Sequence, residues 1–87
     1  MFSVFINKKS QKNIDKMPLV IKDIMALLIE DLKYKGPILK SWANFSKLED
    51  SKYHCHLSRK WIACWKHEKN SIVIEVYYAG SRENAPY

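Results

Sequence analysis

Glycine, proline and cysteine are scarce in this chain of 87 residues, which has two Gly, three Pro and two Cys. So little Gly and Pro excludes a collagen-like or low-complexity protein, and two cysteines exclude a scaffold held by several disulfides. The longest apolar run, residues 24–29, is far too short to span a bilayer. The charges of the N-terminal segment follow its apolar stretch, which is the reverse of a secretory signal. We therefore expect one domain over residues 1–87, located in the cytoplasm and without a membrane segment.

Acidic residues are also few: nine Asp and Glu stand against 15 Lys and Arg, which gives a net charge of +6. The basic residues recur along the whole chain. This favours a polyanionic partner such as nucleic acid, because Lys and Arg release counterions from phosphates. The same excess can simply keep a small protein soluble. Charge therefore indicates a class of partner and not an activity.

The first half of the sequence predicts one short strand followed by two helices. Residues 2–6 (FSVFI) have the composition of a strand. Ser10 can cap a short helix that ends before Pro18. Pro18 suits the first position of a second helix, which runs to about Lys35 and stops at Gly36-Pro37. Apolar residues at helical spacing predict the buried face of that helix: Ile21, Met25, Leu28 and Leu32.

The second half predicts a meander of strands. Residues 38–48 are compatible with a strand that has an irregular half. Clearer strands are expected at 53–57, 61–66 and 71–78, joined by polar turns, and Gly80 ends the last of them. The expected fold is therefore α+β: a small antiparallel β-sheet with the two N-terminal helices packed on one face.

Two histidines flank a cysteine in His54-Cys55-His56. On a strand, alternation places both imidazoles on one face and the thiol on the other. Such a pair can act as acid and base, because imidazole titrates near neutrality. With His67 or a Cys as a third ligand the pair could instead hold zinc, and as ordinary surface residues the histidines would do neither. Cys55 and Cys64 are expected to be small buried hydrophobes, with at most one bridge between them.

Two candidates for phosphate chemistry lie near the end of the sequence. Arg82 follows Gly80-Ser81 just past the strongest strand. An Arg in such a place can bind a phosphate or stabilise a pentacovalent transition state, or it can form an ion pair with Glu83 or Glu75. The phenol of Tyr87 can reach the same site or remain in solvent.

A family resemblance is carried by two segments, YHCHLSRKWIACW (residues 53–65) and IEVYYAGSRENAPY (residues 74–87). They resemble the RelE/YafQ family of type II toxins, which are mRNA interferases. The most specific feature is Cys-His-Leu followed, five residues after that His, by a Trp. In YafQ-like members the His of such a run is catalytic and matches His56, whereas two lysines on this strand of RelE match His54 and His56. The catalytic Arg of a Gly-Lys-Arg-Glu turn matches Arg82, and a Tyr after it matches Tyr87.

The resemblance implies a RelE-like fold and cleavage of mRNA in the ribosomal A site, without a metal or cofactor. In that reaction the 2′-OH of the nucleotide attacks the adjacent phosphate, which restricts cleavage to RNA. By the match, His56 is the general acid or base, and His54 is its partner or a backbone contact. Arg82 stabilises the phosphorane, and Tyr87 orients or deprotonates the 2′-OH or stacks on a base. The residues expected to bind RNA are Lys52, Arg59, Lys60 and Trp61.

Three departures from the family pattern bear on the charged groups. Ile62 stands where RelE has an Arg, so Arg59 or Lys60 would have to supply that charge. Lys60 itself stands where YafQ-like enzymes have an acidic residue. Residues 40–43 contain no counterpart of their upstream His. The partner in proton transfer is accordingly open between His54 and Lys60.

The family also implies a protein partner. A cognate antitoxin with an acidic segment would suit a basic groove, and the toxin would be a monomer within a hetero-oligomeric complex. The main alternative is a ParE-like, non-enzymatic toxin that binds DNA gyrase, which RNA cleavage would separate from an interferase. A further alternative is an RNA-binding module without a reaction, whose salt-sensitive binding would not respond to His56→Ala.

Overall fold

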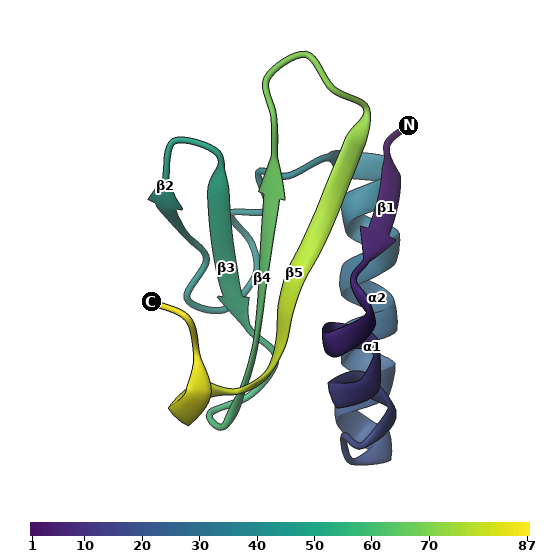
Figure 1. Cartoon of the computed structure of the whole chain (residues 1–87), viewed down its shortest axis with the longest axis vertical. Helices are drawn as coiled ribbons and strands as arrows, with labels where there is room; N and C mark the ends of the chain where they lie inside the picture. Colours follow the sequence, from purple (N-terminus) through teal and green to yellow (C-terminus); the bar gives the residue numbers. More distant parts are fainter.

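Five strands form one sheet in the order β1-β5-β4-β3-β2 in the computed structural model, which describes residues 1–87 (Figure 1). The elements in chain order are β1 (Ser3–Ile6), α1 (Lys8–Asp15), α2 (Leu19–Lys35), β2 (Ser46–Glu49), β3 (Lys52–His56), β4 (Trp61–His67), β5 (Val73–Ser81) and the 3-10 helix η1 (Arg82–Asn84). The expected class, two N-terminal helices packed on a small sheet, is confirmed. One strand pair differs from the expectation, because β1 runs parallel to β5 whereas all other pairs are antiparallel. Parallel neighbours need a long crossover, and here all the elements between β1 and β5 supply it.

The core lies between α2 and the sheet. The predicted stripe of α2 is confirmed, since Ile21, Met25, Leu28 and Leu32 are all buried. It packs in one cluster with inward side chains of the strands, among them Trp65. The helix ends at Gly36, whose φ of 88° favours glycine. Neither helix combines the length and the apolar character needed to cross a membrane.

Helix α1 covers the part of the β5 edge that β1 leaves unpaired. β1 pairs with residues 73–76 of β5 only. Beyond them, the side-chain amide of Asn7 donates to the carbonyl of Tyr77 (3.1 Å) and that of Asn13 to the carbonyl of Ala79 (3.0 Å). Asn7 is also the N-cap, accepting from the backbone N–H of Ser10 at 2.8 Å. The expectation that Ser10 caps this helix is wrong, because Ser10 lies inside it and is buried.

Strand β5 continues through Gly80, so the expectation that Gly80 ends it is wrong. Gly80 pairs with Ile62 and the strand runs on to Ser81. A Cβ at Gly80 would come within 2.8 Å of the Tyr78 hydroxyl oxygen and 3.2 Å of Asn13 Nδ2. Glycine therefore serves close packing over the strand here, and not a turn. The ambiguous residues 38–48 form an irregular connection followed by the start of the edge strand β2.

Candidate functional site

The central strands present two chemically different faces. The register pairs Cys55 with Ala63 and His54 with Cys64, and cross-strand partners share a face. Cys55 and Ala63 belong to the core beneath the helices, whereas His54, His56 and Cys64 lie on the face away from the helices, hereafter the open face. The two cysteines are therefore on opposite faces of the sheet. Both are free, and both are buried, as expected. Burial raises the pKa of each thiol to about 12.

Three rings meet on the open face. The centroids of His54 and His56 are 5.6 Å apart, and the ring of Tyr87 meets His54 edge-on at 4.7 Å. The predicted placement of both imidazoles on one face is thus confirmed. His54 is only 8% exposed, while His56 is half-buried. The C-terminal residue of the sequence therefore forms part of the wall around the histidine pair.

The surroundings of His54 and Tyr87 favour the neutral form of each side chain near pH 7. Burial, and next the neighbouring His56, lower the pKa of His54 below its ordinary value, whereas a hydrogen bond to the backbone of Ser46 opposes this shift. Burial, and next the nearby Cys64, raise the pKa of the Tyr87 phenol, although the positive charge of Arg82 opposes the shift. A neutral imidazole can accept a proton and a protonated phenol can donate a hydrogen bond.

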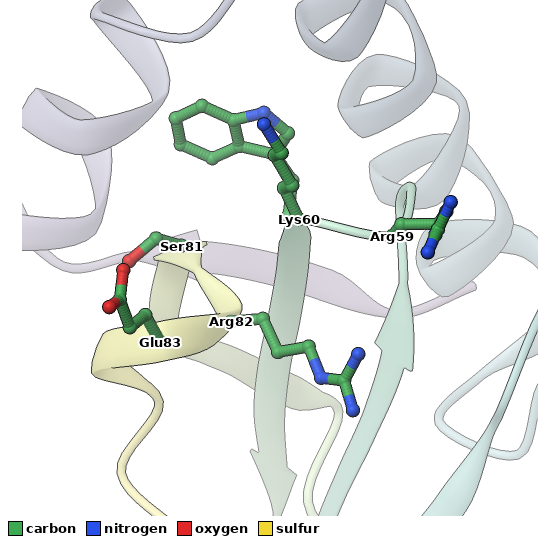
Figure 2. Close-up of a pocket in the computed structure, with 6 residues that line it drawn as sticks. Arg59, Lys60, Ser81, Arg82 and Glu83 are labelled. Carbon is green, nitrogen blue, oxygen red and sulfur yellow. The ribbon is translucent and has the colours of Figure 1, made fainter.

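Arg82 lines a cavity of about 520 Å³ at the end of the sheet, together with Arg59, Lys60, Trp61, Ser81 and Glu83. In Figure 2 the Arg82 side chain extends across β4 in the direction of β3, whereas the Arg59 side chain points away from Arg82. The backbone N–H of Arg82 donates to the carbonyl of Lys60 at 2.7 Å, which ties η1 to the turn between β3 and β4. The alternative ion pairs of Arg82 do not form, since Glu75 pairs with Lys66 and no carboxylate lies within 4.0 Å of Arg82. Its guanidinium remains available to an anion.

The sequence-predicted residues thus fall into two neighbouring groups. His54 contacts both His56 and Tyr87, and Arg59, Lys60, Trp61 and Arg82 line one cavity. Lys52 belongs to neither group. Its amine pairs with Glu49 at 3.2 Å and lies 5.5 Å from the ring centroid of Tyr77. It lines a separate hollow of about 470 Å³ that Tyr87 also borders.

Residues around β2 position the histidines and escape prediction from the sequence. The Ser46 hydroxyl lies 2.9 Å from Nδ1 of His54, and the Asn44 amide lies 3.4 Å from Nδ1 of His56. The backbone N–H of His56 donates to the carbonyl of Ala43 at 2.9 Å. These residues lie in the stretch whose structure the sequence left ambiguous, and only the long-range pairing of β2 with β3 brings them to the site.

His67, considered as a third zinc ligand, is far from the histidine pair. It sits at the other end of β4, where its Nε2 lies 2.6 Å from the carbonyl of Ser71 and its ring meets Phe2. The structure contains no group of three or more His, Cys, Asp and Glu side chains placed to hold a metal ion. The zinc alternative therefore lacks its third ligand.

No protein-family model matches the chain, and no curated protein is similar to it in sequence. Solved structures are similar in fold. A chain of the archaeal RelE–RelB complex from Pyrococcus horikoshii OT3 superposes with a TM-score of 0.76 at 15% identity, covering 97% of this chain and 98% of that one. The isolated E. coli RelE toxin gives 0.75 at 11% identity, with 99% and 89% covered. A chain of the YoeB–YefM complex from Staphylococcus aureus gives 0.70 at 8% identity, with 92% and 95% covered. The fold is therefore that of RelE and YoeB, as the sequence resemblance implies.

Proposed function

We propose that this protein is the toxin of a type II toxin–antitoxin module and inhibits translation by cutting mRNA in the ribosomal A site. One observation carries the proposal: His54 contacts both His56 and Tyr87 on one face of the sheet, and Arg82, which has no ion-pair partner, extends across β4 toward the strand of the two histidines (Figure 2). The same fold occurs in a protein described as a toxin, E. coli RelE. Proton-transfer groups beside a free cation are what metal-independent RNA cleavage needs.

In the proposed reaction the 2′-oxygen of the substrate attacks the adjacent phosphorus, and the bond from phosphorus to the 5′-oxygen breaks. The products are a 2′,3′-cyclic phosphate and a free 5′-OH. His54, held neutral by burial, takes the proton of the 2′-OH, and His56 gives a proton to the departing 5′-oxygen. The protons balance, because the substrate loses one proton to His54 and gains one from His56.

Arg82 and Tyr87 serve the charge that develops between these steps. The phosphorane gains negative charge on its non-bridging oxygens, and a planar guanidinium can donate to two of them. Tyr87, whose pKa is raised by burial, keeps its phenolic proton and orients the 2′-OH or a phosphate oxygen as a donor. Deprotonation of the 2′-OH by Tyr87 is thereby the less favourable of the roles that the resemblance implies.

Basic residues around the cavity would hold the RNA. Arg59 and Lys60 contact phosphates, and Trp61, half-buried at the cavity wall, offers a stacking surface to a base. Lys52 can contribute only in part, because Glu49 neutralises it. The ribosome would supply further positioning of the mRNA, which is worth several orders of magnitude in rate for well-oriented groups.

A cognate antitoxin is the proposed protein partner, with the toxin as a monomer in a hetero-oligomeric complex in the cytoplasm. The RelE–RelB and YoeB–YefM complexes pair each of those proteins with a second protein. The net charge of +6 favours an acidic segment of the antitoxin.

The proposal is tested by adding purified protein to a translation reaction and mapping new 5′ ends of the mRNA by primer extension. We expect cuts at fixed positions within codons for the wild type, lost in His56→Ala and in Arg82→Ala. His67→Ala is the matched control, because it removes a histidine remote from the site, and it should cut like the wild type. Intact mRNA with translation blocked would overturn the nuclease mechanism, and inhibition of gyrase supercoiling in its place would identify a ParE-like toxin.

A further inference from the structure

A second cavity, of about 420 Å³, adjoins the one that holds Arg82. It lies against α1 and is lined by Lys9, Asn13, Lys16, Trp61, Tyr78, Gly80, Ser81 and Asn84. The two cavities share Trp61 and Ser81 as a common wall. An RNA strand that leaves the Arg82 cavity past Trp61 therefore enters the second cavity.

The floor of the second cavity is fixed by close packing. The Asn13 amide holds α1 to β5 through the carbonyl of Ala79 (3.0 Å), and the Tyr78 hydroxyl donates to the carbonyl of Ser81 (2.7 Å). Gly80 leaves no room for a Cβ beneath these groups, since its nearest neighbour would be the Tyr78 hydroxyl oxygen at 2.8 Å. The cavity is thus a preformed feature of the fold.

The walls carry positive charge without compensation. Lys9 and Lys16 are seven residues apart, two helical turns, and so lie on one side of α1. Lys9 belongs to the helix and Lys16 is its C-cap. Both are exposed, neither is in an ion pair, and no acidic residue lines the cavity. Two free ammonium groups beside amides and an aromatic wall suit the phosphates and riboses of a nucleic-acid strand.

We propose that this second cavity binds the backbone of the RNA strand whose scissile phosphate lies at Arg82, with Lys9 and Lys16 each contacting a phosphate. The inference rests on the proposed function, that the protein acts on RNA. It adds a binding site on α1 that is separate from the acid–base groups. Phosphates of ribosomal RNA share this chemistry, so the experiment must separate substrate RNA from the ribosome.

The test measures binding of fluorescent single-stranded RNAs of three and ten nucleotides, made uncleavable by 2′-O-methyl groups, at several salt concentrations. The short RNA can fill the Arg82 cavity alone, whereas the long one can reach both. We expect the Lys9→Ala/Lys16→Ala variant to bind the long RNA about 25-fold more weakly at 0.1 M salt, since each phosphate contact contributes about fivefold relative to 1 M. The slope of log K against log salt should become shallower by about 1.4, and binding of the short RNA should not change.

Lys40→Ala/Lys69→Ala is the matched control, because it removes the same charge from two exposed lysines that line neither cavity. Equal losses in the two double variants would reduce the effect to net charge and overturn the inference. Unchanged binding of both RNAs, with weaker binding to ribosomes, would assign the cavity to ribosomal RNA and overturn it as well. Absence of mRNA cleavage by the wild type would refute the proposed function, while a selective loss on the long RNA would still support the site.

Discussion

His54 makes the stability of the fold depend on pH in a direction that the structure fixes. Its imidazole is 8% exposed, and burial together with His56 lowers its pKa below the ordinary value of 6.5. The unfolded chain therefore binds a proton at His54 more readily than the folded chain does. The stability that neutral His54 provides is present above about pH 6.5 and is lost as the pH falls through that value toward the lowered pKa.

The size of the effect is bounded by the number of protons involved. One proton taken up on unfolding changes the free energy of unfolding by at most about 1.4 kcal/mol per pH unit. We expect the wild type to lose stability at up to this slope between pH 6.5 and the lowered pKa, over and above the loss caused by its other groups. His54→Gln keeps a polar group for Ser46 but cannot titrate, so its curve should be flatter by that amount.

Urea unfolding at pH values from 8 to 5 measures this difference directly, with His67→Gln as a control that removes a histidine outside the site. The control shows how much of any change in slope follows from removing a histidine outside the site. Parallel curves for the wild type and His54→Gln over the whole range would refute the assignment of a lowered pKa to His54. A steeper curve for His54→Gln would reverse its sign.

Three further substitutions test the stability of the fold and the chemistry of the proposed site. Gly36→Ala should lower the free energy of unfolding by about 1–3 kcal/mol, because φ is 88° there and the new Cβ would lie 2.9 Å from Phe2 Cε1; urea unfolding measures it. Asn13→Ala should cost about 1–3 kcal/mol in the same assay, since the carbonyl of Ala79 loses its half-buried partner; an unchanged midpoint would contradict that contact. Arg82→Lys should cut mRNA at least tenfold more slowly than the wild type, because an ammonium lacks the two-pronged geometry of a guanidinium, and primer extension would show a wild-type rate if charge alone sufficed.

Where one periodicity dominates, the sequence is sufficient to place the element. The stripe from Ile21 to Leu32 predicts α2 and its buried face, and the alternation in His54-Cys55-His56 predicts which side chains share a face. Each of these patterns depends only on the local geometry of a helix or a strand. The same local information places both imidazoles of the site together.

The sequence-based predictions fail where a contact with a residue distant in the sequence decides the local structure. Ser10 has the chemistry of an N-cap, but Asn7 takes that position because its amide also reaches β5. Gly80 would end a strand by its propensity, yet Asn13 and Tyr78 pack where its side chain would be. Asn44 and Ser46 reach the histidines only through the pairing of β2 with β3. None of these contacts leaves a signal within a few residues of the position it decides.

The substitution of an apolar residue where RelE has an Arg has a structural consequence for the site. Ile62 pairs with His56 on one side and with Gly80 on the other, so it lies between β3 and the strand that leads to Arg82. Ile62 is fully buried and supplies no charge, so the positive charge at this end of the sheet comes from Arg82 of η1 and from Arg59 and Lys60 of the turn between β3 and β4. An apolar floor weakens the screening of that charge, because electrostatic interactions strengthen as the local dielectric falls. Under the proposed function, Arg82 would therefore stabilise the phosphorane together with Arg59 and Lys60, which line the same cavity.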